Sequence, residues 1–327
     1  MTDASTIEAA GSDARARWSD VGFVGLGRMG AAMAANLAVA GRRVFGYVRR
    51  PEDASRLASL GIQVTTNIAD LFGCGIVVSM LPDDDAVRDV ALGRADLGAH
   101  GLAQGLGPGA IHLCMATIST AMASRLDSEH RLRGQGYVAA PVFGNPDAAR
   151  QRLLYILAAG DADDLARCQP LFDSLGQKTL TVGAEPWHAN LVKLLGNMMS
   201  ATALEMISEA VTVFLKRGLD PKPFLDIMTG TMFGGRVHKL YGDKIVARSY
   251  APGFVMPLVL KDVRLALAEA EAAGAPMPSV GVVRDRLITG IARGHEGLDW
   301  TGLGLVAAEE AGISLLPLRT VNPAPAE

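Results

Sequence analysis

A lysine and an asparagine stand one helical turn apart in a stretch that otherwise reads as a long apolar helix. The stretch is PWHANLVKLLGNMMSATALEMISEA, residues 186–210, with Lys193 in its first half and Asn197 after it. Residues at i and i+4 share a helix face. Desolvation lowers the pKa of a lysine toward neutrality, which suits a general acid or base, and its ammonium stabilises a developing alkoxide. The alternative is a lysine whose stem packs on apolar surface while its head reaches water.

A second candidate site lies near the start of the chain, where Gly25, Gly27 and Gly30 form G-x-G-x-x-G between a strand-like VGFV and a helix-like stretch. In a strand–turn–helix context this motif predicts a dinucleotide site, because the glycines permit a tight turn and a close approach of the pyrophosphate to the backbone. The helix N-terminus then offers amide donors to the phosphates. The alternative is a glycine-rich turn without a ligand. The predicted cofactor residues of this turn are Gly25, Leu26, Gly27, Arg28, Met29 and Gly30.

The end of the second predicted strand, FGYVRRPEDA, bears on the choice of cofactor. NAD sites usually place an acid there for the ribose 2′-hydroxyl, whereas an arginine accommodates the 2′-phosphate of NADP. This chain has Arg49 and Arg50, and its first acid, Glu52, comes later. Paired guanidinium groups bind phosphate by charge-assisted hydrogen bonds. We therefore expect NADP(H) to be preferred, with NAD(H) as a second possibility; the alternative is that the arginines cap a solvated surface.

The surrounding pattern predicts the elements that position these residues. Over residues 20–183, short apolar strands alternate with helical stretches, which is typical of an α/β Rossmann-type domain with a doubly wound, mainly parallel sheet. Over 184–313 the strand signals stop and helical periodicity takes over, so we expect an all-α domain that begins with a long interdomain helix. Residues 1–19 and 314–327 read as flexible tails.

Composition narrows the class of protein. The chain has 327 residues, 49% hydrophobic and 20% charged, with a net charge of −3 and a pI near 6.1. These values predict a globular protein with no electrostatic footprint for nucleic acid or an anionic membrane. Cys74, Cys114 and Cys168 match no metal-ligand or disulfide spacing, so we expect no metal and a cytoplasmic location. No apolar run long enough for a membrane span is free of charge, and no secretory signal is expected.

Taken together, GFVGLGRMGAAMAANL, SMLPDDDAV, MATIS, APVFG, KLLGN and LKDVRLAL, in this order, resemble the β-hydroxyacid dehydrogenases. That family includes 3-hydroxyisobutyrate dehydrogenase and tartronate semialdehyde reductase and is related to 6-phosphogluconate dehydrogenase and to imine reductases. The resemblance covers residues 21–310. The combination with K-x-x-x-N on a long helix is more specific than the glycine motif.

The resemblance implies particular roles. Lys193 would be the general acid that protonates the carbonyl oxygen as hydride arrives, and Asn197 would hold the substrate or orient Lys193. Further cofactor contacts would come from Leu81, Pro82, Thr117 and Lys261, the last with Asp262 behind it. The implied substrate-binding residues are Thr117, Phe143, Gly144, Asn145, Lys193 and Asn197.

The sequence departs from the family pattern at three places. Phe143 stands where many members have a serine that binds the substrate carboxylate, and Asn145 stands where they have a second glycine. Ala116 replaces a hydroxyl donor, and Trp187 and Ala189 stand where glycines are common. These changes favour a less polar pocket and a bulkier or less acidic carbonyl substrate. The alternative is that backbone amides of the same segment still bind a carboxylate.

The expected function is therefore an NADPH-preferring oxidoreductase acting on a carbonyl or alcohol, of the semialdehyde or β-hydroxyacid type. An imine reductase is the enzymatic alternative, and a non-catalytic cofactor-binding scaffold is the alternative of another class. We expect a small-molecule substrate and no nucleic acid or membrane partner. The long helix carries more apolar surface than one domain needs, which predicts a homodimer through the helical domain, or a tetramer.

Overall fold

The computed structural model describes residues 20–94 and 100–314, so the predicted tails lie outside the described residues except for Ser314. The chain divides into two compact units, residues 1–193 and 194–327. The division falls within helix α9 (Trp187–Lys216), which supplies residues to both units. Each unit is described by itself below.

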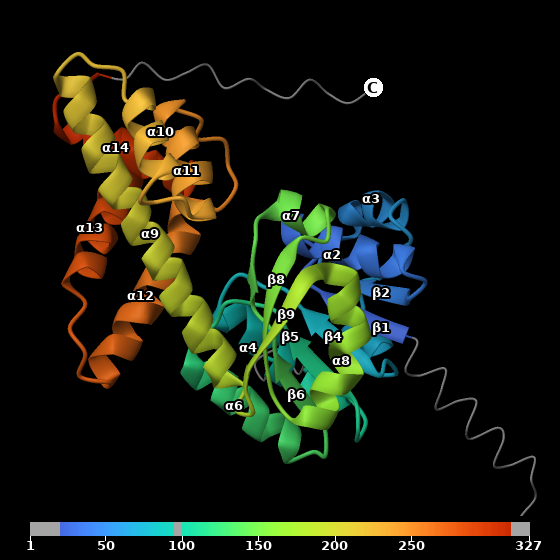
Figure 1. Cartoon of the computed structure of the whole chain (residues 1–327). Coiled ribbons are helices and arrows are strands. Elements are labelled where there is room, and N and C mark those ends of the chain that lie inside the picture. The colour runs from blue at the N-terminus through green and yellow to red at the C-terminus, as the bar shows by residue number, and fades with distance from the viewer. Residues whose placement is uncertain (1–19, 95–99, 315–327) are drawn as a thin grey trace, which may run out of the picture. The chain divides into compact units, whose positions relative to one another are not determined.

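The first unit is built on a mainly parallel sheet, shown in the centre of Figure 1. Its strands are β1 (Asp20–Val24), β2 (Arg43–Tyr47), β3 (Ile62–Thr65), β4 (Ile76–Ser79), β5 (Ile111–Cys114), β6 (Gly136–Ala139), β7 (Val142–Phe143), β8 (Leu154–Ala159) and β9 (Gly176–Gly183). The order β3-β2-β1-β4-β5-β6 is parallel throughout, and β8 then pairs antiparallel with β6 and β7 and parallel with β9. This order confirms the predicted doubly wound Rossmann-type sheet, whose ligands bind at the carboxyl ends of the strands.

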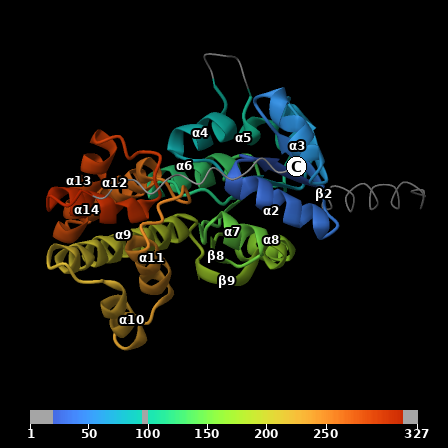
Figure 2. The same ribbon diagram turned by 90° about the horizontal axis from the view of Figure 1, so that it is seen from above.

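Helices cover both faces of this sheet (Figure 2). They are α2 (Arg28–Val39), α3 (Ala54–Ala58), α4 (Asp84–Leu92), α5 (Leu102–Gly105), α6 (Thr120–Arg131), α7 (Pro146–Arg150) and α8 (Ala162–Leu175). α2 packs beside α7 and α8 on one face, and α4 packs beside α5 and α6 on the other. Fully buried side chains such as Phe23, Met33 and Phe172 fill the first interface, and Val87 and Leu126 fill the second. The sheet is therefore held rigid at the strand ends from which the cofactor loops depart.

The second unit is entirely helical in its described residues, as the sequence predicted. It contains the greater part of α9, with α10 (Lys222–Gly230), α11 (Arg236–Val246), α12 (Met256–Ala272), α13 (Pro278–Ala292) and α14 (Leu303–Glu310). Leu204, Ile207 and Val211 of α9 enter its hydrophobic core, where Trp300 is also buried. Among residues 20–94 and 100–314, α9 alone is long and apolar enough to cross a membrane by length and composition, a test that core helices also pass.

A chain of polar side chains runs through the first unit beneath the end of β4. Ser79 Oγ lies 2.8 Å from His112 Nε2, His112 Nδ1 lies 2.9 Å from His130 Nε2, and His130 Nδ1 lies 2.7 Å from Gln135 Oε1. The Gln135 amide group donates to two backbone carbonyls, so its oxygen must accept from His130. It follows that His112 donates to His130 and that Ser79 donates to His112, with both rings neutral.

Neutral buried histidines predict an acid-sensitive fold. Burial lowers the pKa of His130 to about 4, below its ordinary value of 6.5. Because the unfolded chain takes up the proton first, stability is fully present above pH 6.5 and falls as the pH drops toward 4, by about 3 kcal/mol for this residue. Urea unfolding between pH 7 and pH 4 should show this loss, with a shallower slope in His130→Asn. His100→Gln, at an exposed site, should keep the wild-type slope. An unchanged slope in His130→Asn would contradict the assignment.

Candidate functional site

The three glycines of the first turn differ in why a side chain would or would not fit at their positions. Gly25 has φ +89°, and a Cβ there would lie 2.2 Å from the carbonyl oxygen of Met80. A Cβ at Gly30 would lie 2.0 Å from the carbonyl oxygen of Gly25, so the turn and α2 pack backbone against backbone. A Cβ at Gly27 would meet no atom within 4 Å. Gly25 and Gly30 are thus required by the fold, whereas Gly27 leaves an open space beside the turn.

The start of α2 faces that open space. Gly27 occupies the N-cap, and no side chain caps the first turn, which also contains no acidic residue. The amides of the first helical turn are therefore available to an anion, as a pyrophosphate requires. Of the other predicted turn residues, Arg28 is exposed, Leu26 is buried in the core and Met29 packs against it. Leu26 and Met29 can therefore offer a ligand mainly their backbone.

Arg49 and Arg50 follow β2 at the same edge of the sheet. β2 runs parallel to β1, and its last residue, Tyr47, lies opposite Val24, the last residue of β1. The glycine turn that follows β1 and the arginines that follow β2 therefore leave the sheet side by side. Both arginines are exposed, and within the described ranges neither has an ion-pair partner in the structure. The two guanidinium groups are free to meet a phosphate at this edge.

The loops after β4 and β5 hold the next predicted residues, and a side chain missed by sequence reasoning ties them together. Leu81 is half-buried and Pro82 exposed after β4, and Thr117 is half-buried after β5. Asp84 accepts a hydrogen bond from the backbone N–H of Ser119 at 2.9 Å, across 35 positions of sequence, and also accepts one from its hydroxyl. Asp84 lies two residues after Pro82, and Ser119 lies two residues after Thr117. The hydrogen bond between them therefore fixes the distance between the two loops that carry these predicted cofactor contacts.

Lys193 lies against an aromatic ring of the first unit. Its Nζ is 4.5 Å from the centroid of the Phe143 ring, a cation–π contact, and the lysine is buried. Three residues earlier on α9, Asn190 donates from Nδ2 to the carbonyl of Ile118 at 3.4 Å, beside Thr117. Asn190 is fully buried and, among the described residues, its Oδ1 has no hydrogen-bond partner. Sequence reasoning did not select Asn190, because its contact lies 72 positions away along the chain.

The departures from the family pattern separate into two kinds. Ala116 and Ala189 are fully buried in one hydrophobic cluster, so they shape packing and present nothing to a ligand. Phe143 and Trp187 are only partly buried and pack against that same cluster. Of the four, Phe143 is the one whose ring contacts the proposed acid.

The neighbours of Phe143 have roles in the turn that follows it. Gly144 has φ +145°, and a Cβ there would lie 2.6 Å from Leu154 Cδ2. The side-chain oxygen of Asn145 accepts from the N–H of Ala148 and so caps α7. That oxygen is committed to the fold, which leaves the Asn145 Nδ2 group and the backbone amides as the donors that this segment can offer to a substrate.

The remaining predicted residues lie in the second unit. Asn197 donates from Nδ2 to Asp262 Oδ2 at 2.6 Å, and Lys261 Nζ lies 2.9 Å from Asp262 Oδ1. Asn197 and Asp262 are both buried. Asn197 follows Lys193 by one turn of α9. The carboxylate of Asp262 fixes the orientation of the Asn197 side-chain amide.

Among residues 20–94 and 100–314, no group of three His, Cys, Asp or Glu side chains is placed to hold a metal ion.

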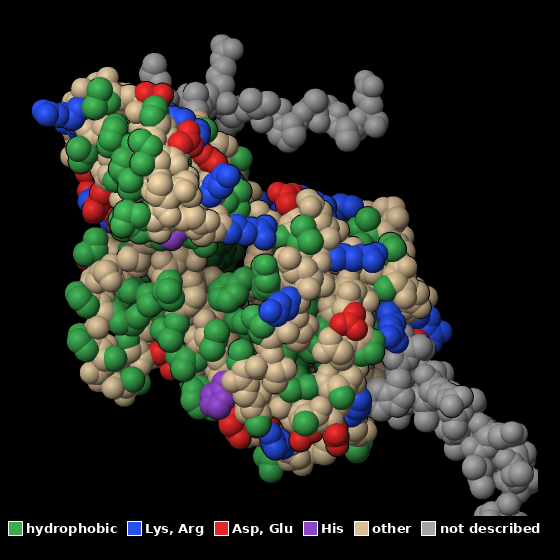
Figure 3. All heavy atoms as spheres, in the orientation of Figure 1, with side chains coloured by type: hydrophobic (Ala, Val, Ile, Leu, Met, Phe, Trp, Pro, Cys, Tyr) green, Lys and Arg blue, Asp and Glu red, His purple; other side chains and the backbone are tan. Residues whose placement is uncertain are grey.

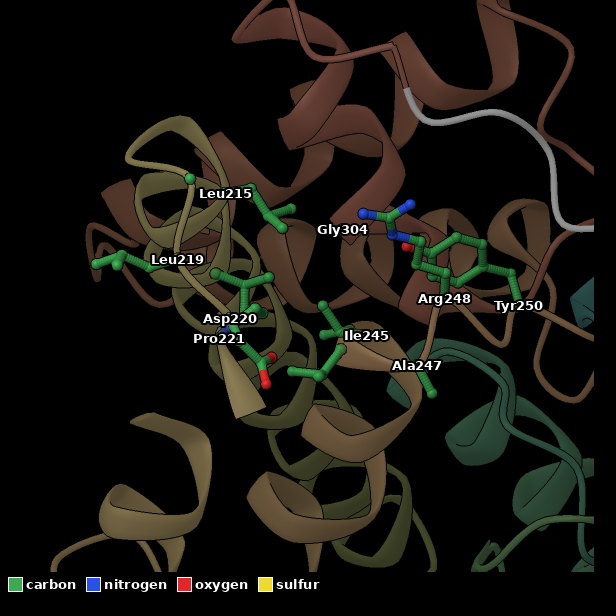
Figure 4. A pocket seen from close by; sticks show the side chains of 12 residues that line it. Leu215, Leu219, Asp220, Pro221, Ile245, Ala247, Arg248, Tyr250 and Gly304 are labelled. Carbon is green, nitrogen blue, oxygen red and sulfur yellow. The ribbon is translucent and has the colours of Figure 1, made fainter. Parts of the chain in front are cut away.

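A cavity of about 530 Å³ lies in the helical unit and contains none of the predicted site residues (Figure 4). Its lining includes Leu215, Leu219, Asp220, Ile245, Arg248 and Tyr250.

Comparison with family models covers almost the whole described chain. Residues 20–183 match the NAD-binding domain of 6-phosphogluconate dehydrogenase. Residues 188–307 match the model described as the NAD-binding of NADP-dependent 3-hydroxyisobutyrate dehydrogenase.

Individual relatives align over nearly their full lengths. An oxidoreductase of Bacillus subtilis (strain 168), YfjR, is 37% identical over 286 residues, or 86% of this chain and 98% of the relative. The 2-hydroxy-3-oxopropionate reductase of Escherichia coli (strain K12) is 31% identical over 284 residues, or 86% of this chain and 95% of the relative.

Solved structures share the two-domain plan. A 3-hydroxyisobutyrate dehydrogenase of Mycobacterium tuberculosis, solved with L-serine, has a TM-score of 0.77 and 26% identity, covering 88% of this chain and 98% of its own. An imine reductase from Pseudomonas sp. has a TM-score of 0.54 and 20% identity, covering 88% of this chain and 98% of its own; this likeness shows the fold alone.

Proposed function

This chain is an NAD(P)-dependent oxidoreductase of the β-hydroxyacid dehydrogenase family, and we propose that it uses NADPH by preference to reduce a carbonyl compound, with Lys193 as the proton donor. The observation that carries the proposal is the placement of Lys193: a buried ammonium beside the Phe143 ring, on the helix that also presents Asn197. An ammonium group that is largely withdrawn from water needs a compensating interaction or a chemical role.

The reaction follows from this arrangement. When bound, the nicotinamide would supply a hydride to the carbonyl carbon. Lys193 donates a proton from Nζ to the oxygen, the C=O π bond becomes an O–H and C–H pair, and the lysine regains its proton from solvent. Until transfer, the ammonium stabilises the growing negative charge on that oxygen. Asn197, fixed by Asp262, orients the substrate or the lysine. In the reverse direction the neutral amine accepts the proton.

Phe143 bears on the type of substrate that the enzyme accepts. Its ring offers apolar area and no hydrogen bond beside Lys193, which supports a carbonyl compound with a bulkier, less acidic substituent. A semialdehyde or β-hydroxyacid whose carboxylate binds the amides of Gly144 and Asn145 is the other candidate. Imine reduction is favoured by the same apolar ring but not by the lysine, because an iminium substrate already carries its proton and its positive charge is repelled by an ammonium group.

An activity panel tests this proposal. Purified protein with NADPH or NADH is given aryl and alkyl aldehydes, semialdehydes, keto acids and cyclic imines, and nucleotide absorbance is followed. We expect turnover of aldehydes, fastest with apolar substituents. Imine turnover that survives Lys193→Ala would support the imine reductase instead, and no turnover of any class would overturn the proposal.

Replacing one arginine after β2 tests the cofactor preference. Arg49→Ala is expected to weaken NADPH binding about tenfold and leave NADH binding nearly unchanged, since a charge-assisted contact to the 2′-phosphate contributes about 1.5 kcal/mol. Nucleotide fluorescence titration measures both affinities. Arg42→Ala, in the turn before β2, is the matched control. Equal losses for NADPH and NADH in Arg49→Ala would mean that the 2′-phosphate is bound elsewhere.

We also propose that the enzyme acts in the cytoplasm on a small molecule and assembles as a homodimer through its helical unit, with a tetramer as the alternative. Support comes from the apolar side chains that α9 leaves exposed. Net charge and composition support the absence of nucleic-acid and membrane partners.

A further inference from the structure

The cavity of about 530 Å³ in the helical unit has an apolar floor and an open rim. Val211 of α9 and Ile245 of α11 line it, and both belong to the hydrophobic core of that unit. Leu219 and Asp220, which follow α9, also line the cavity and are exposed, so it opens to solvent on their side. Its volume lies within the range of small-molecule sites, roughly 300–1,000 Å³.

Two polar side chains of the segment after α11 line the cavity on the other side. Figure 4 shows Arg248 and Tyr250 opposite Leu219 and Asp220. Among the described residues, the Arg248 guanidinium makes no ion pair or hydrogen bond, and the Tyr250 hydroxyl makes no hydrogen bond. Burial raises the pKa of the Tyr250 hydroxyl to about 12, and the nearby charge of Arg248 opposes this rise. The cavity therefore holds two hydrogen-bond donors that have no partner within the described chain.

Arg248 has a backbone conformation that arginine rarely adopts. Its φ is +53°, in the left-handed region that favours glycine. The N–H of Arg248 donates to the carbonyl of Ile245 at 3.1 Å, and the N–H of Ser249 donates to the carbonyl of Lys244 at 2.9 Å. These two hydrogen bonds form a Schellman motif, which ends a helix with a left-handed residue that is usually glycine.

Other helices of this chain end with the usual glycine. The same position is a glycine with positive φ after α2, α9, α12, α13 and α14. Among residues 20–94 and 100–314, the non-glycine residues with positive φ are Arg248 and Arg152, which follows α7 and is exposed. A guanidinium at the end of a helix interacts favourably with the helix dipole, and this applies to both arginines. Only Arg248 of the two also lines a cavity, which indicates a role for its side chain beyond the turn.

The groups in the cavity define the chemistry of a ligand. A guanidinium and a hydroxyl without partners bind a carboxylate by charge-assisted hydrogen bonds. The apolar floor removes an alkyl or aryl chain from water. Asp220, whose Oδ1 already accepts from the N–H of Lys222 at 2.9 Å, repels a second negative charge on the opposite side. These groups therefore favour a monocarboxylate over a dicarboxylate.

The protein as a whole offers no general attraction to anions. Its net charge is −3, and on the face shown in Figure 3 basic and acidic side chains are interspersed. A field that collects anions needs a surface of predominantly positive charge. Binding of an anion in the cavity therefore depends on Arg248 itself.

We propose that this cavity binds a second small molecule besides the cofactor and the substrate, a monocarboxylate with an apolar chain. Its carboxylate is bound by Arg248 and Tyr250, and its chain lies against Val211 and Ile245. The cavity contains none of the residues proposed for catalysis or cofactor binding, so this ligand uses residues of its own. The inference does not depend on the proposed function.

Calorimetric titration of the full-length protein measures this binding. The probes are butanoate, hexanoate and octanoate, and octanol, octylamine and octanedioate vary the head group. Affinity is expected to rise roughly fourfold for each methylene that the floor buries. Octanol should bind about tenfold more weakly than octanoate, because it cannot form the charge-assisted contact. Octanedioate should also bind more weakly than octanoate, because its second carboxylate faces Asp220.

Substitutions in the same titration identify the residues. Arg248→Gly removes the guanidinium and places a residue that adopts this backbone conformation without strain. It should weaken octanoate binding about tenfold or more, with a melting temperature no lower than that of wild type. Tyr250→Phe keeps the ring and should weaken binding about threefold. Arg152→Gly, the same change at the other left-handed arginine, is the matched control and should bind octanoate as wild type does.

Four results would overturn the proposal. The first is the absence of octanoate binding in the millimolar range, and the second is equal binding by wild type and Arg248→Gly. The third is tighter binding of octylamine or octanol than of octanoate, which would exclude a carboxylate as the ligand. The fourth is binding that survives Arg248→Gly but is lost in Lys193→Met, which would place the carboxylate beside the proposed proton donor instead.

Discussion

Lys193→Met is expected to lower the turnover of carbonyl reduction about 10³-fold, with little change in NADPH affinity. Methionine keeps the length and apolar contacts of the side chain but cannot donate a proton, and general acid catalysis contributes roughly 10²- to 10⁴-fold. The loss should fall on kcat more than on KM, because the ammonium acts on charge that develops only in the transition state. Steady-state assays and nucleotide titration measure the two effects.

A matched lysine controls for the loss of a cation. Lys244 Nζ lies 5.8 Å from the ring centroid of Tyr241 on α11, so it makes the same kind of contact outside the proposed site. Lys244→Met should keep wild-type turnover. A Lys193→Met enzyme with the wild-type rate would remove Lys193 from the chemistry. A loss of NADPH affinity equal to the loss of rate would make it a binding residue.

The features predicted well from sequence are those encoded locally. The glycine turn, the strand that precedes it and the helix that follows lie within residues 20–39, and the strand order then follows from the rules of doubly wound sheets. The i, i+4 relation of Lys193 and Asn197 depends only on helix geometry. These inferences needed no knowledge of contacts between distant segments.

Long-range contacts were beyond sequence reasoning. The hydrogen bond between Asp84, at the start of α4, and Ser119, at the N-cap of α6, joins segments 35 positions apart, a separation that no local sequence pattern reports. Phe143 was identified as a departure, but the position of Lys193 over its ring depends on how α9 begins. Lys261 was expected with Asp262 behind it, but the hydrogen bond from Asn197 of α9 to the Asp262 carboxylate, across 65 positions, had no signal in the sequence. In each case the deciding partner lies on another element or on a face that periodicity does not specify.

Two substitutions in the glycine turn should distinguish an effect on protein stability from an effect on cofactor binding. Gly27→Ala is expected to leave the free enzyme as stable as wild type, because a Cβ there meets no atom within 4 Å, and to weaken NADPH binding tenfold or more, because that space is where a pyrophosphate approaches. Gly30→Ala is its matched partner: its Cβ would lie 2.0 Å from the Gly25 carbonyl oxygen, so α2 must move and stability should fall by several kcal/mol. Thermal unfolding without nucleotide, followed by titration with NADPH, distinguishes them. If Gly27→Ala bound NADPH as tightly as wild type, the phosphates would not lie against this turn, and the open space beside Gly27 would have another use.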